Sequence, residues 1–97
     1  VVVIGDVHHG ARVIAKGNII ILGELKGSVF AGAAGNEEAV IVALEMAPVQ
    51  IRIGGLSSRV GEKSRRLGRG PMIARAEEGQ IRTRPIKKNF LHMLNFN

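Results

Sequence analysis

The sequence predicts an all-β fold, a β-helix closed by a C-terminal β-hairpin, and three observations support this. Apolar runs recur at a nearly constant spacing, at residues 1–4, 19–22 and 40–44. Gly and then an acidic residue follow each of the first two runs. Gly also makes up 13 of the 97 residues, which disfavours helices and suits tight corners between short strands. Repeats of this length bury their apolar faces only by stacking on one another.

The strands follow in order from β-branched runs punctuated by Gly. Each of the first two repeats predicts two strands joined by Gly corners, and a third strand pair follows. Pro48 splits that third pair, because proline cannot donate to a strand ladder and marks a bend. The predicted strands are residues 1–4, 11–15, 19–22, 28–31, 39–46 and 49–53.

The C-terminal half departs from this repeat. Residues 57–71 are rich in Ser, Gly and basic residues, a composition that predicts a flexible basic loop. Apolar-polar alternation on both sides of Glu77-Glu78-Gly79 predicts a hairpin. The predicted organisation is therefore a β-helix body at 1–56, a loop at 57–71, a closing strand or hairpin at 72–86, and a tail at 87–97 that could form a short helix.

Composition narrows the class of protein. The net charge of +6 divides into −2 for residues 1–51 and +8 for residues 52–97, which suits an acidic protein segment, an anionic lipid surface or nucleic acid. The absence of Cys fits a reducing compartment, and no apolar stretch reaches the roughly 20 residues needed to span a bilayer. Because the chain opens on Val1 inside an apolar run, we expect it to be part of a longer protein.

The three apolar runs predict a dimer. A solenoid strand with one solvent-facing side should alternate apolar and polar residues, but these runs are apolar at every position. Stacked in register, they would expose an apolar face, and such a face normally marks an interface. Ile20 and Ile41 are candidate outward positions, although the sequence alone does not decide the phase. The predicted dimer face comprises Val1, Val2, Val3, Ile4, Ile19, Ile20, Ile21, Leu22, Val40, Ile41 and Val42.

The sequence offers little support for a catalytic site, a metal site or a nucleic-acid-binding site. His8 and His9 are neighbours, and in an extended segment their side chains would point to opposite faces, which disfavours chelation of one ion. Asp6 is the only Asp, and no Ser-His-acid or paired-carboxylate set can be assembled. The Gly-rich segment 32–36 lacks the Lys-Ser/Thr of a phosphate loop. Nucleic-acid binding would need stacking aromatic residues, but Tyr and Trp are absent. We expect no enzyme activity and no cofactor.

The first two repeats carry a pattern specific enough to suggest a family. Its residues are Val2-Val3-Ile4-Gly5-Asp6-Val7, Gly10-Ala11, Ile14-Ala15, Gly17-Asn18-Ile19, Leu22-Gly23 and Gly27, together with the most specific part, Ala31-Gly32-Ala33-Ala34-Gly35-Asn36 and Glu38-Ala39. In these residues the chain resembles the C-terminal domain of the MinC family of septum site-determining proteins. The final hairpin, residues 73–81, also fits, so the resemblance extends from residue 1 to about 85.

The resemblance implies a right-handed β-helix, a triangular solenoid, that acts as a homodimeric inhibitor of bacterial division. Its implied partners are MinD, a membrane-bound ATPase, and the C-terminal tail of FtsZ. Its implied location is the cytoplasm, at the inner face of the cell membrane when bound to MinD. The family's Arg-Ser-Gly-Gln motif for MinD would lie just upstream of Val1. The implied MinD-binding surface is Asp6, His8, His9, Gly10 and Arg12, and the implied FtsZ-tail contact is Arg12, Lys16 and Lys26.

Two other readings of a β-helix remain open at this point. A self-assembling cytoskeletal scaffold of the bactofilin type has a similar repeat, and end-to-end polymerisation would distinguish it. A hexapeptide-repeat acyltransferase is a weaker alternative, because this repeat does not run in sixes and no catalytic histidine has an identifiable setting.

Overall fold

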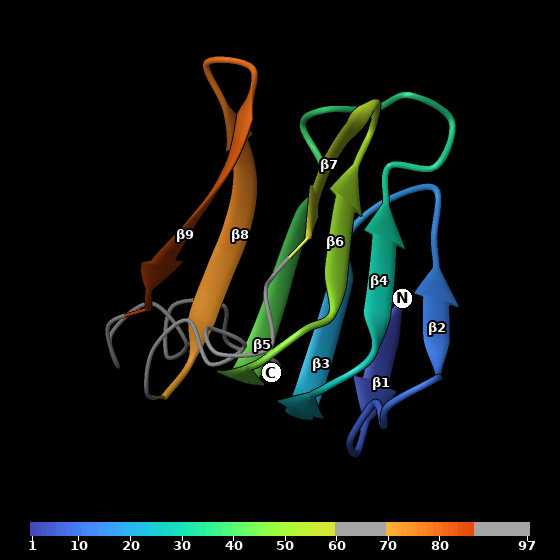
Figure 1. The fold of residues 1–97 in the computed structure, drawn as a ribbon, viewed down its shortest axis with the longest axis vertical. Helices are drawn as coiled ribbons and strands as arrows, with labels where there is room; N and C mark the ends of the chain where they lie inside the picture. Colours follow the sequence, from blue (N-terminus) through green and yellow to red (C-terminus); the bar gives the residue numbers. More distant parts are fainter. Residues whose placement is uncertain (60–69, 87–97) are drawn as a thin grey trace, which may run out of the picture.

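The computed structural model describes residues 1–59 and 70–86, which form two mixed β-sheets facing each other (Figure 1). Sheet A has the order β1-β3-β5-β8-β9, with strands Val2–Ile4, Ile19–Leu25, Val40–Met46, Met72–Glu77 and Gln80–Pro85. Sheet B has the order β2-β4-β6-β7, with strands Arg12–Ile14, Ser28–Ala31, Gln50–Ile53 and Leu56–Arg59. The chain alternates between the sheets from β1 to β6, so consecutive strands lie in opposite layers.

The apolar runs stack as parallel neighbours in sheet A. Val2 pairs with Ile20, and Ile20 pairs in turn with Val42. The register of β3 on β5 shifts beyond Ile21, because β3 carries a bulge before Glu24. The spacing of the first two runs in the sequence therefore corresponds directly to the register of β1 on β3.

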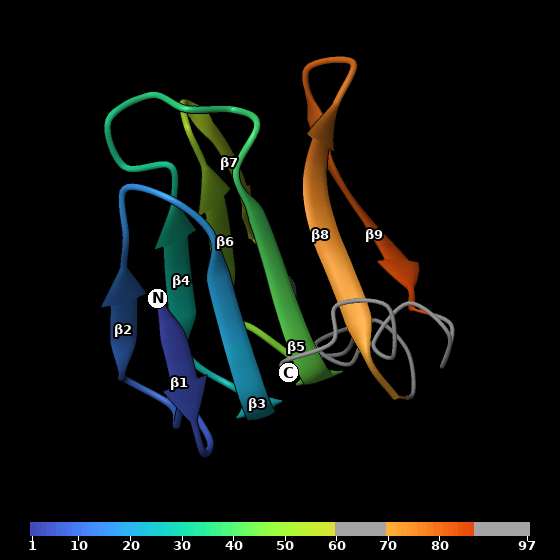
Figure 2. The same cartoon turned by 180° about the vertical axis from the view of Figure 1, so that it is seen from behind.

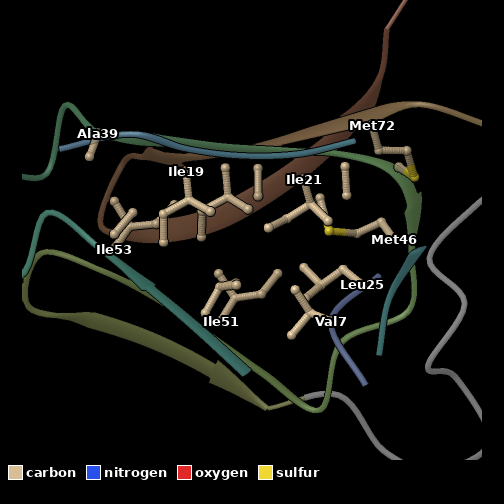
Figure 3. Close-up of a cluster of buried hydrophobic side chains, with 14 of the residues drawn as sticks. Val7, Ile19, Ile21, Leu25, Ala39, Met46, Ile51, Ile53 and Met72 are labelled. Atoms are coloured by element: carbon tan, nitrogen blue, oxygen red, sulfur yellow. The ribbon is translucent and has the colours of Figure 1, made fainter. Parts of the chain in front are cut away.

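The core lies between the two sheets (Figure 3). Sheet A contributes alternate residues of each strand, among them Ile19, Ile21 and Ile41, all fully buried. Sheet B contributes Val29 and Ile51 from the opposite side. Burying a Val or Ile side chain stabilises the fold by roughly 1.5–3 kcal/mol, so this layer supplies most of the driving force for folding.

The corners between the sheets are stacked as closely as the strands. The N–H groups of Lys26 and Gly27 both donate to the Val7 carbonyl, at 2.8 and 3.1 Å. A Cβ atom at Gly27 would lie 2.6 Å from the His8 carbonyl oxygen, inside contact distance. Only glycine therefore allows the corner after β3 to pack on the corner after β1.

The prediction of a right-handed β-helix is wrong, although the fold is all-β. The strands form two mixed sheets and no closed solenoid in the part of the chain that the structure describes. The parallel stacking ends at β5 and β6, because β8 pairs antiparallel with β5 and β7 pairs antiparallel with β6 (Figure 2). A solenoid requires each coil to continue in the direction of the last, and here the chain reverses in both sheets.

The C-terminal elements agree in part with the predicted organisation. The hairpin of β8 and β9 lies where the Glu77-Glu78-Gly79 turn predicts it. β7 lies at the start of the predicted basic loop, so residues 57–59 of that loop are a strand instead. Residues 60–69 of the predicted loop and the predicted tail 87–97 lie outside the described residues.

Candidate partner-binding surfaces

The segment from Asp6 to Arg12 forms an exposed corner between β1 and β2. The Ala11 N–H donates to the His8 carbonyl at 3.0 Å, closing a β-turn with Gly10 in its third position. Gly10 has φ of +83°, the left-handed value that a type II turn requires there. A Cβ atom added at Gly10 would meet no atom within 4 Å beyond its chain neighbours, so nothing packs closely against this position.

Asp6 has a structural role at the same corner. Its Oδ1 atom accepts a hydrogen bond of 2.7 Å from the Glu24 N–H, which ties the end of β1 to β3. His8, His9 and Arg12 are all exposed. The sequence-predicted MinD surface is thus one continuous segment, but Asp6 already has a partner within the fold.

The fold places the three predicted FtsZ-tail residues at different points of sheet B and its corners. Arg12 begins β2, and Lys16 follows the end of that strand, about 13 Å away along an extended chain. Lys26 lies at the next corner, and its Nζ is 3.3 Å from Glu24 Oε1. Arg12 is the only one of the three whose cationic group contacts an aromatic ring in the described structure.

That ring is Phe30, and it reveals two residues that sequence reasoning missed. The guanidinium carbon of Arg12 lies 5.6 Å from the Phe30 ring centroid, and that of Arg52 lies 5.2 Å from it. Arg12, Phe30 and Arg52 come from adjacent strands β2, β4 and β6 on the outer face of sheet B. Ile14, 56% exposed, pairs with Phe30 and adds an apolar surface. The interval in the sequence between Phe30 and Arg52 equals that between Ile20 and Val42 in sheet A. This equal interval is the signal by which the sequence could have shown that Phe30 and Arg52 are neighbours.

The outer face of sheet A carries the second apolar phase of the three runs. Val2 is 56% exposed and Ile4 is 87% exposed, while Ile20 and Leu22 are half-buried. Val42 is buried but stands outside the core cluster, between Ile20 and Ile73 in the register. The outward residues of this face are Val2, Ile4, Ile20, Leu22, Val40, Val42, Leu44 and Ile73.

Four of the eleven residues of the predicted dimer face point toward the core instead. Ile19, Ile21 and Ile41 lie in the core with no exposed surface, and Val3 packs against that core. Ile41 is therefore not an outward position, because the pleat turns it toward sheet B. Ile20, the other candidate, does lie on the outer face.

Charged side chains also gather on the β8–β9 hairpin. An open hollow of about 370 Å³ lies on the β8–β9 hairpin between Glu77, Glu78, Arg82 and Arg84. Its side chains pair with one another, as Arg84 Nη2 contacts Glu77 Oε1 at 2.6 Å. Across residues 1–59 and 70–86, no three His, Cys, Asp or Glu side chains gather to hold a metal ion. No helix in this part of the chain could cross a membrane.

Comparison with known proteins gives a consistent family signal. The family model described as "Septum formation inhibitor MinC, C-terminal domain" matches residues 1–86. The probable septum site-determining protein MinC of Agathobacter rectalis is 42% identical over 104 residues, covering 97% of this chain and 43% of that protein. Its counterpart in Synechocystis sp. is 44% identical over 88 residues, covering 91% of this chain and 35% of that protein. The chain thus spans less than half the length of these relatives.

A solved structure supports the same relationship. A chain of the MinC:MinD cell division protein complex of Aquifex aeolicus superposes with a TM-score of 0.82 at 37% sequence identity. The match covers 96% of this chain and 77% of that one.

Proposed function

Because the chain belongs to the family of the C-terminal domain of the septum formation inhibitor MinC, we propose that it is the partner-binding module of a division-site regulator. The observation that carries this proposal is the match, over nearly the whole chain, to a chain of a MinC:MinD complex. The module acts by binding, without catalysis or a cofactor. MinD, the FtsZ tail and a second copy of the chain are its proposed partners, and it reaches the inner face of the cell membrane through MinD.

The proposed MinD contact is the corner around His8, His9, Gly10 and Arg12. A Cβ atom added at Gly10 would meet no atom within 4 Å beyond its chain neighbours. A partner's backbone could approach there without displacing any side chain. Asp6 contributes indirectly, because its hydrogen bond to the Glu24 N–H holds the corner in place.

The test is recruitment to MinD on anionic vesicles in the presence of ATP, followed by co-sedimentation. The protein tested should be the full natural protein. Recruitment that depends on both MinD and ATP supports the proposal. Failure of the folded natural chain to sediment with MinD-coated vesicles would overturn it.

The proposed FtsZ contact lies on sheet B, where Arg12 faces outward, with Lys16 and Lys26 at its ends. Family tails of FtsZ carry acidic residues, which these cations attract. Exposed ion pairs stabilise a complex by only about 0–1 kcal/mol each and are screened beyond roughly 8–10 Å at physiological salt. Binding should therefore weaken as the salt concentration rises, and a salt-independent affinity would argue against this contact.

The proposed homodimer forms through the outer face of sheet A. This face joins apolar residues of β1, β3, β5 and β8, of which Val2 and Ile4 are the most exposed. A contiguous apolar face is typically covered in the functional assembly. The relatives named above are septum site-determining proteins, and the alternative of a bactofilin-type scaffold finds no support in them.

A further inference from the structure

Two arginines on the outer face of sheet B are held against one aromatic ring. Arg12 and Arg52 both contact Phe30, at 5.6 and 5.2 Å from the ring centroid. The ion pairs within residues 1–59 and 70–86 involve other residues. Cation–π contacts hold a guanidinium in place while leaving its N–H donors available. The face therefore presents two positioned guanidinium groups.

The register explains why these side chains meet. Phe30 on the central strand β4 is directly opposite Ile14 of β2 and Arg52 of β6. Arg12 precedes Ile14 by two positions and so projects from the same face of β2. Figure 1 shows β2, β4 and β6 side by side in this sheet. The result is a patch with a cation on each side of an aromatic residue and exposed Ile14 beside them.

The chemistry of this patch favours carboxylates over other anions. A guanidinium offers paired N–H donors that match the two oxygens of a carboxylate. Nucleic acid would need an aromatic face free for base stacking, but Phe30 already contacts both guanidiniums. Two separate cations suit two carboxylates on one extended peptide.

We propose that Arg12, Phe30 and Arg52 form the binding site for an extended acidic peptide that presents two carboxylates. Each arginine binds one carboxylate, Phe30 positions both guanidiniums, and Ile14 packs against an apolar residue of the peptide. This inference rests on the proposed FtsZ contact for its natural ligand. It adds Arg52 and Phe30 to that contact and places Lys16 and Lys26 at its periphery.

The test is fluorescence anisotropy with two labelled probes, the FtsZ C-terminal peptide of the same organism and a synthetic Glu-x-Glu peptide. Arg52→Gln should weaken binding of both probes about threefold to tenfold. Arg52→Lys should lose a similar amount, because lysine keeps the charge but not the planar group that stacks on Phe30. Phe30→Leu should weaken binding while leaving net charge unchanged. The matched control is Arg82→Gln, which removes the same charge from the edge strand β9, outside the residues of the proposed dimer face.

The outcomes separate the two proposals. If Arg52→Gln and Arg82→Gln weaken binding equally, the effect is general attraction and the inference is overturned. If a Gln-x-Gln peptide or a labelled oligothymidine binds as tightly as the acidic probe, the site is not a carboxylate site. Binding of the acidic probe but not of the FtsZ peptide would keep the inference and overturn the FtsZ contact. Binding of neither probe would overturn both.

Discussion

Replacing Ile20 with Asp tests the proposed dimer and the phase of the strands together. Ile20 lies on the outer face of sheet A, between Val2 and Val42 in the register. Burying a side chain of this size stabilises an interface by roughly 1.5–3 kcal/mol. Ile20 is already half-buried in the single chain, so the lower figure applies. A symmetric dimer loses this contribution twice, about 3 kcal/mol, which raises the dissociation constant by at least about 100-fold.

The measurement is sedimentation velocity over a concentration series, with circular dichroism to confirm the fold. Ile14→Asp is the matched control, because Ile14 is a strand Ile exposed on the outer face of the other sheet. It should leave the dimer intact. Ile41→Asp, by contrast, places a charge in the core and should unfold the chain. A folded Ile20→Asp variant that dimerises as tightly as the parent would refute the face assignment.

Three further predictions concern glycines and turns. Gly27→Ala should lower the free energy of unfolding by about 2 kcal/mol and the melting temperature by about 8–16 °C, because the added Cβ collides with the His8 carbonyl; an unchanged melting curve would contradict this packing. Glu78→Asn should raise the free energy of unfolding by about 0.5 kcal/mol in chemical denaturation. Glu78 has φ of +52° in the hairpin turn, and Asn adopts this left-handed conformation more readily than Glu. A loss of stability would contradict the turn assignment. Gly10→Asp should destabilise the chain by only about 1 kcal/mol, because its φ is positive but an added Cβ meets no other atom. The same change should abolish recruitment of the natural protein to MinD-coated vesicles, and full recruitment would exclude this corner from the MinD surface.

From the sequence, the candidate MinD-binding surface could be located only as a continuous segment, without the role of each residue. The corner from Asp6 to Arg12 was recognisable because Gly10 and its neighbours match a family pattern. The actual roles within it depend on contacts that sequence does not display, such as the hydrogen bond from the Glu24 N–H to Asp6.

The cluster of Arg12, Phe30 and Arg52 went unnoticed because its members are far apart in the chain and meet only through the register of sheet B. The spacing between Val2 and Ile20 in sheet A, applied to β2, would place Arg12 directly opposite Phe30. The structure places Ile14 there instead, and Arg12 reaches the ring diagonally. The spacing of β1 and β3 therefore does not give the register of β2 on β4, whereas the spacing of β3 and β5 does give that of β4 on β6.

The sequence by itself determined the all-β class, the approximate positions of β1 to β6 and the C-terminal hairpin, because short apolar runs, Gly corners and Pro48 act locally on the backbone. Only the tertiary structure decided which phase of each run faces inward. In Ile19-Ile20-Ile21-Leu22 both phases are apolar, so alternation carries no information, and the opposing layer of Val29 and Ile51 selects Ile19 and Ile21 for the core. The reversal at β8, which ends the parallel stacking of sheet A, was likewise decided by pairing between distant strands. The reversal at β7 is local by contrast, because β6 and β7 form a hairpin with only Gly54 and Gly55 between them.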